Sequence, residues 1–100
     1  MTAKISYTYR LENVEERARR YPGTFEIPPL VERSKLWIGD RVKLIFSPGE
    51  RMWVEVFAIE TDPIIYHGRL VSTPVVACLK IGDLVEFAPE NVAAIEREPR

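Results

Sequence analysis

The spacing of apolar and polar residues changes along the chain and predicts different elements in different segments. Residues 4–10 alternate apolar and polar without a break, which is the period of a half-buried strand and equally suits a flexible arm. Residues 13–21 repeat apolar side chains at helical spacing and begin with the capping pair Asn13 and Glu16. The pattern therefore predicts a short helix over 13–21, preceded by an arm or edge strand over 1–10.

Strand-like periods dominate the rest of the chain. Short apolar or alternating runs, separated by turn-forming residues, begin at Arg41, Met52, Ile64, Leu84 and Val92. The longest run, 52–61, is apolar on both faces, which favours a central or bent strand, with Trp53, Phe57 and Ile59 on one of them. We expect a single α+β domain over residues 1–100 with one N-terminal helix and a β-rich core over 41–97. That core is a small, strongly bent antiparallel sheet or a partial SH3-like or OB-like barrel of about five strands.

Two segments repeat one short motif. Residues 36–44 read LWIGDRVKL and residues 79–87 read LKIGDLVEF, so Leu, Ile-Gly-Asp and Val recur at the same offsets. A Gly free to adopt positive φ and an Asp able to bond the local backbone describe a turn that leads into a strand. We expect each Gly to precede a strand of one sheet and each Val to face the same core, at Gly39 with Val42 and at Gly82 with Val85.

Composition indicates an ordinary globular domain. Hydrophobic residues make up 46% of the chain and charged residues 29%, and the net charge is −1 with both signs interspersed. No apolar run approaches the roughly 20 residues that span a bilayer, and no secretory signal is recognised, so we expect a cytoplasmic location without membrane contact. The single cysteine, Cys78, lies in an apolar run and is expected to be buried and inert.

Motifs of catalysis, cofactor binding and metal binding are not recognised. The chain has no Gly-rich phosphate loop and no paired cysteines, and its single histidine, His67, has no companion ligand at metal-binding spacing. Asp40 and Asp83 of the repeated motif also lack further ligands beside them, which favours their role in turns. We therefore expect no enzymatic activity, no cofactor and no metal site. A small enzyme is the least favoured hypothesis, and it would need His67 in a cleft with a second titratable group within hydrogen-bond reach.

Aromatic and charged residues suggest binding instead. Tryptophan and arginine are enriched at interaction hot spots, although a tryptophan such as Trp53 is more often the principal core residue of a small domain. The sequence leaves open whether the two tryptophans lie in the core or on the surface. The leading hypothesis is a non-catalytic module that binds a protein, or a second copy of itself, through Trp37, Trp53, Tyr66, His67 and Arg69.

Nucleic-acid binding is the alternative from another class. A strand face that combines cations with stacking rings suits a polynucleotide, and the residues concerned are Lys35, Arg41, Lys43 and Arg51. Acidic residues among them, including Glu55, weaken the positive field on which such binding depends. Glu55 also interrupts an apolar face, so burial of that face would require a partner such as Arg41, Lys43 or Arg69.

A longer pattern resembles a known family. The chain carries Glu50-x-Met52-Trp53-Val54-x-Val56, Gly68-x-Leu70 followed by Pro74, Leu79-Lys80-x-Gly82-Asp83-x-Val85-x-Phe87 and a closing Ile95. Together these resemble the bacterial family catalogued as domain of unknown function 2314, over about residues 14–96. Thr73 and Glu96 depart from that family's pattern, which has Asn and Trp at the matching places. The resemblance implies a fold and no particular activity.

Overall fold

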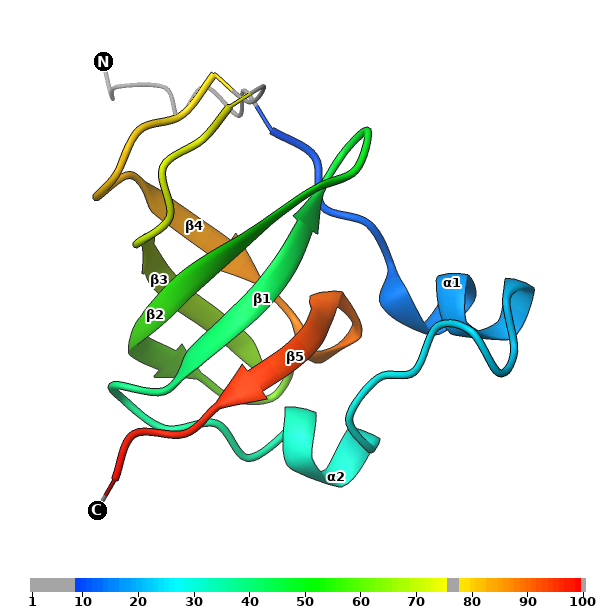
Figure 1. Cartoon of the computed structure of the whole chain (residues 1–100). Coiled ribbons are helices and arrows are strands. Elements are labelled where there is room, and N and C mark those ends of the chain that lie inside the picture. The colour runs from blue at the N-terminus through cyan, green and yellow to red at the C-terminus, as the bar shows by residue number, and fades with distance from the viewer. Residues whose placement is uncertain (1–8, 76–77, 100) are drawn as a thin grey trace.

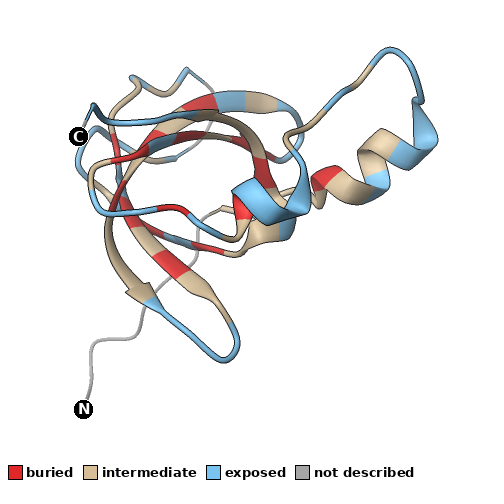
Figure 2. Cartoon of the chain, turned by 90° about the horizontal axis from the view of Figure 1, so that it is seen from below, coloured by how far each residue is buried: buried red, intermediate tan, exposed pale blue. Residues whose placement is uncertain are grey.

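The computed structural model describes residues 9–75 and 78–99, and its centre is one five-stranded antiparallel sheet in the order β4-β3-β2-β1-β5 (Figure 1). The strands are β1 (Arg41–Phe46), β2 (Glu50–Glu60), β3 (Ile65–Leu70), β4 (Leu84–Phe87) and β5 (Val92–Glu96). Seen from below, the sheet curls round its buried residues (Figure 2), and its two edge strands do not pair with each other. The predicted α+β class and bent sheet of about five strands are confirmed.

The helices lie to one side of this sheet (Figure 1). Helix α1 (Val14–Arg20) is the predicted one, and the Asn13 side chain caps it by accepting from the N–H groups of Glu15 and Glu16. A four-residue helix α2 (Leu30–Arg33) and a 3₁₀ turn η1 (Pro89–Asn91) were not expected, because such short elements give no periodic signal. None of the described helices is long and apolar enough to span a membrane.

The described end of the N-terminal arm runs beside the end of β1. Leu11 forms an antiparallel bridge with Phe46, and the Tyr9 ring meets the Phe46 ring edge-on at 5.7 Å between centroids. The Tyr9 hydroxyl also accepts from the N–H of Glu86 in β4 at 3.2 Å. Tyr9 thus spans from the end of β1 to β4. The rest of the predicted arm, residues 1–8, lies outside the described residues.

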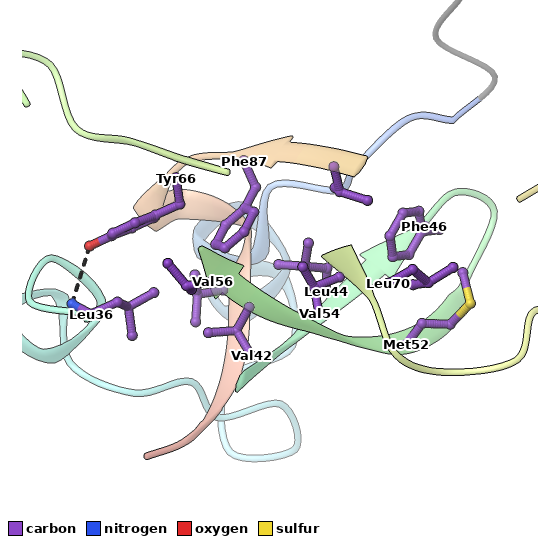
Figure 3. Packing of buried hydrophobic residues seen from close by; sticks show 12 residues of the cluster. Leu36, Val42, Leu44, Phe46, Met52, Val54, Val56, Tyr66, Leu70 and Phe87 are labelled. Carbon is purple, nitrogen blue, oxygen red and sulfur yellow. Dashed lines mark hydrogen bonds between the residues drawn. The ribbon is translucent and has the colours of Figure 1, made fainter. Parts of the chain in front are cut away.

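Buried residues from all five strands meet in one core. Figure 3 shows it as a continuous cluster, made of Leu36, Val42, Leu44, Phe46, Met52, Val54, Val56, Tyr66, Leu70, Val85, Phe87 and Val92. Strand β2 carries a bulge, because its register with β3 shifts between Val56 and Ala58. Val56 faces the core before the bulge and Ile59 packs against it afterwards. The prediction that Phe57 and Ile59 share one face is therefore wrong.

The repeated motif folds twice into the same turn. Gly39 and Gly82 have φ of 96° and 94°, where a side chain would be strained. In each copy the Asp carboxylate accepts from the N–H three residues earlier, at 2.8 Å for Asp40 and 2.9 Å for Asp83. In each copy the Gly N–H also donates to the adjoining strand, to the carbonyl oxygens of Val56 and Leu70. Both turns lead into strands of one sheet, and the buried positions of Val42 and Val85 are confirmed.

One buried arginine joins the helical segments to each other. Arg33 is only 5% exposed, and its Nε donates to the carbonyl of Pro28 at 2.7 Å. Its Nη1 donates to the Glu15 carboxylate of α1 at 2.8 Å and to the carbonyl of Pro89 in η1 at 3.0 Å. The guanidinium therefore connects α1, the chain before α2, and η1, with every hydrogen bond directed at an oxygen that attracts its charge.

Candidate functional site

The side chains that alternate with core residues point to the opposite, outer face of the sheet. Val42 pairs with Val54 on the inner face, so the flanking residues of both strands point outward. Strand β3 behaves in the same way beside its buried Tyr66, Gly68 and Leu70. We define the outer face by these residues: Arg41, Lys43, Trp53, Glu55, Phe57, His67, Arg69 and, from β5, Glu96.

A row of alternating charges crosses four strands of the outer face. Arg41 pairs in register with Glu96 of β5 on one side and with Glu55 of β2 on the other. Glu55 pairs in turn with Arg69 of β3. Among the described residues, no ion pair within 4.0 Å involves any of the four. We call this set the charge row, and two hollows of about 550 and 440 Å³ lie along it and share Glu55.

Two aromatic rings beside the charge row each carry a cation. Lys43 Nζ lies 5.2 Å from the centre of the Trp53 ring, and Arg69 Cζ lies 4.8 Å from that of Phe57. Contacts of this kind stabilise by about 0.5–1 kcal/mol at exposed sites. Trp53 is half-buried on the outer face, so the expectation that it is the principal core residue is wrong. Val54, the next residue, is buried in the core. Because successive strand residues point to opposite faces, the Trp53 side chain points outward.

His67 lies at one end of this face and is held by two neighbours. Its Nε2 is 2.7 Å from Glu60 Oε2, and its ring centre is 6.5 Å from that of Phe57. Among the described residues, no group of three or more His, Cys, Asp and Glu side chains could hold a metal ion. His67 and Glu60 therefore form a partly exposed pair that adds polar contacts to the rim of the outer face.

Tyr66 does not belong to the surface that the sequence suggested for it. Its side chain is 1% exposed, its hydroxyl donates to the carbonyl of Arg33 at 2.8 Å, and it accepts from the N–H of Leu36 at 3.4 Å (Figure 3). Burial raises the pKa of the phenol, since the phenolate would lose its hydration. Tyr66 thus anchors the segment before β1 to the core and is removed from the set of binding residues.

Trp37 is an exposed aromatic residue that the structure does not bring into the outer face. It is 60% exposed in the turn before β1, and the next residue, Ile38, is exposed as well. Ile38 lines the same hollow as Phe57 and Arg69. The sequence left open whether the two tryptophans lie in the core or on the surface. Neither lies in the core, because Trp37 is exposed and Trp53 is half-buried on the outer face.

The cations proposed for nucleic acid do not form an uninterrupted basic strip. Lys35 lies in the loop between α2 and β1, and Arg41 stands between two glutamates of the charge row. Lys43 lies over Trp53, and Arg51 lies over the ring of Phe25, with Cζ 5.7 Å from its centre. Of these four cations, only Arg41 and Lys43 share a strand.

The C-terminal segment contributes residues that sequence reasoning missed. Asp40 is fully buried and accepts from the N–H of Glu98 at 2.9 Å and from Arg97 Nη1 at 3.3 Å, besides its own turn. The Glu98 carboxylate lies over Gly39, where a Cβ would be 1.9 Å from its Oε1. These contacts hold Glu98 at the edge of the outer face. No sequence signal connects residues so far apart in the chain.

Cys78 also departs from expectation, because it is exposed. The apolar run that contains it follows Pro74, and the described residues of that run lie outside every strand. The next residue, Leu79, packs against the core, whereas Cys78 does not share its burial, so the predicted burial of Cys78 is wrong.

Comparison of the chain with protein-family models, with curated proteins and with solved structures found no match. The resemblance to domain of unknown function 2314 therefore stays a prediction from the sequence.

Proposed function

We propose that this domain is a non-catalytic module that binds a protein partner through the outer face of its sheet. The charge row carries the proposal, because four charges of alternating sign on a sheet face fix the register of a complementary surface. Trp53 and Phe57 supply flat apolar area beside the row, and residues of this type dominate interaction hot spots. The exposed Ile38 extends that area, because it lines the same hollow as Phe57, and Trp37 precedes it in the chain.

A cytoplasmic location belongs to the same proposal. The chain has a single cysteine and so no internal disulfide, which fits a reducing compartment. The exposed position of that residue, Cys78, adds to this, since an exposed thiol persists more readily where disulfides do not form.

Nucleic acid is less well supported as the ligand. The charge row contains two cations and two anions, so it offers a polyphosphate no net positive charge. A salt titration with a generic oligonucleotide separates the two proposals. We expect no measurable affinity at physiological salt, whereas binding that falls steeply with rising salt would favour the nucleic-acid alternative.

Affinity capture from a lysate of the source organism tests the protein-binding proposal. The bait proteins are the wild type, the double variant Arg41→Ala/Arg69→Ala, and Arg19→Ala on the exposed surface of α1 as a matched control. We expect the wild type and the control to recover the same partner, and the double variant to lose it. Equal recovery by all three baits would contradict a role for the outer face.

A further inference from the structure

We propose that the outer face binds a second copy of this chain. This inference rests on the proposed function and names its partner. It is carried by the order of charges in the charge row, which reads Glu96, Arg41, Glu55 and Arg69 from β5 to β3. An even number of alternating charges is complementary to its own reversed copy, so the same four residues on two chains can satisfy each other.

The reversal corresponds to a particular two-fold symmetry. Two outer faces meet with a two-fold axis parallel to the strands, between β1 and β2. This operation keeps positions along the strands and reverses their order across the sheet. Glu96 then faces Arg69 of the second copy, and Arg41 faces its Glu55. A two-fold axis across the strands would instead set each charge of the row against itself, so only the first arrangement is attractive.

The neighbouring pair on one side of the charge row agrees with this axis. One step along the strands, Lys43 and Trp53 pair in register across β1 and β2, so each Lys43 faces a Trp53 of the other copy. On the other side of the charge row, the N–H of Gly39 and the carbonyl of Asp40 both pair with Val56, so the regular register ends there.

In the described part of the chain, two segments approach the outer face, and the first is the C-terminal one, in which Glu98 lies over Gly39 and lines both hollows along the charge row. The other is the segment before α2, which reaches the sheet at Arg51, where the Phe25 ring lies against the guanidinium. The charge row crosses β2 at Glu55, four residues further along the strand. The row spans four strands, or about 14 Å at the usual spacing of roughly 4.8 Å between strands. A stable interface buries about 800 Å² on each partner. A contact this narrow and this charged predicts a weak dimer that rising salt dissociates.

Two charge-reversal variants test the dimer. The expected result is association that returns when they are mixed, which unfolded variants would not show. Arg41→Glu places two like-charged pairs in the dimer, and so does Glu55→Arg, so each variant alone should be monomeric. In a mixture of the two, however, the carboxylate introduced at position 41 faces the guanidinium introduced at position 55, and the native Glu55 of the first variant faces the native Arg41 of the second. We expect association to return only on mixing. Arg19→Glu, on the exposed surface of α1, is the matched control and should behave as the wild type.

Sedimentation velocity at about 10 mM ionic strength, where the Debye length is about 30 Å, is the measurement. The wild type should dimerise with rising concentration, each single variant should associate at least about tenfold more weakly, and about 1 M salt should dissociate the wild type. A wild type that stays monomeric up to its solubility limit would overturn the inference, and so would two variants that remain monomeric when mixed. If the wild type is monomeric but captures a different protein through the outer face, the dimer inference fails and the proposed function stands. The two outcomes are therefore distinguishable.

Discussion

At the scale of single residues, Tyr66 shows how a polar group is made part of a core. Its ring is buried among strand residues, and its hydroxyl satisfies the carbonyl of Arg33 and the N–H of Leu36. A buried polar atom without a partner costs about 1–3 kcal/mol, so the hydroxyl stabilises the fold mainly by leaving neither backbone group unpaired. The same contacts explain why the loop before β1 stays close to the sheet.

Replacement of Tyr66 by phenylalanine should therefore destabilise the protein with little change in shape. We expect Tyr66→Phe to lower the free energy of unfolding by about 1–2 kcal/mol, because it keeps the ring and leaves two buried backbone groups without a partner. Urea denaturation at neutral pH measures the change. A variant as stable as the wild type would contradict the role given to the hydroxyl.

Tyr66 also predicts how stability depends on alkaline pH. Burial raises its pKa in the folded protein above the ordinary value of 10.0, so the folded state favours the protonated phenol. Its contribution to stability is complete below pH 10.0 and is lost as pH rises through the folded pKa. Between neutral pH and the alkaline limit, the wild type should lose more stability than Tyr66→Phe. Parallel pH profiles of the two proteins would contradict this.

Residue type and alternation predicted some of these positions and misplaced others. Val42 and Val85 follow a short, regular period and lie in the core as predicted. Tyr66 was predicted on the binding surface and is buried, and Trp53 was left open, because both ring types occur inside and outside and only the strand register decides. Cys78 was misplaced because, outside a strand, an apolar run does not show which of its side chains face the core: Leu79 packs there and Cys78 is exposed.

At the scale of elements, the two Ile-Gly-Asp turns share their geometry but differ in how many other segments their Asp side chains bind. Asp83 accepts only within its own turn among the hydrogen bonds found for the described residues, and it is half-buried. Asp40 is fully buried and additionally holds Arg97 and the N–H of Glu98. The first turn therefore fixes the C-terminal segment as well as the start of β1.

The comparison of these two turns gives a matched pair of variants. Asp40→Ala should cost about 3 kcal/mol or more, because it removes the charged acceptor to which three groups donate hydrogen bonds. Asp83→Ala should cost about 1 kcal/mol, the usual value for one local side-chain bond. Thermal unfolding measures both, at about 4–8 °C for each kcal/mol in a domain of this size. Equal shifts for the two variants would contradict the larger role of Asp40.

The contacts of Arg33 predict that lysine cannot replace it without loss of stability. Its guanidinium reaches three oxygens in three segments, namely those of Pro28, Glu15 and Pro89. A lysine keeps the charge and lacks the planar fork that serves several acceptors at fixed angles. We expect Arg33→Lys to destabilise by about 1–3 kcal/mol, with earlier loss of helical signal in circular dichroism. Unchanged stability would show that charge alone holds these segments together.

Local signals were sufficient for elements that local chemistry determines. The cap of α1 and the two Ile-Gly-Asp turns depend on residues within a few positions of each other, and the sequence predicted them. The bulge of β2 and the buried contacts of Asp40 depend on neighbouring strands and on the distant C-terminal segment. A pattern along one chain contains no direct record of such pairings, so these features became visible only in the structure.

At the scale of the whole molecule, the sheet uses its two faces differently. The inner face holds one apolar core shared by all five strands, and the outer face holds charges of both signs with rings between them. Opposite charges directly across from each other on neighbouring strands stabilise a sheet by about 0.2–1 kcal/mol for each pair. The same alternation is the pattern that the proposed partner would match.

Self-recognition of this pattern predicts a stability that depends on protein concentration. Any partner that binds only the folded state stabilises it. For two copies of one chain well above the Kd, each tenfold rise in total concentration adds about 0.7 kcal/mol per chain, because the free monomer rises only with the square root of the total. At low ionic strength the Tm of the wild type should therefore rise by several degrees over the accessible concentration range. Arg41→Glu should unfold at one Tm throughout, since the carboxylate that it introduces would face Glu55 of the second copy. High salt should make the wild type equally insensitive to concentration, and a wild-type Tm that is constant at low ionic strength would count against dimerisation in solution.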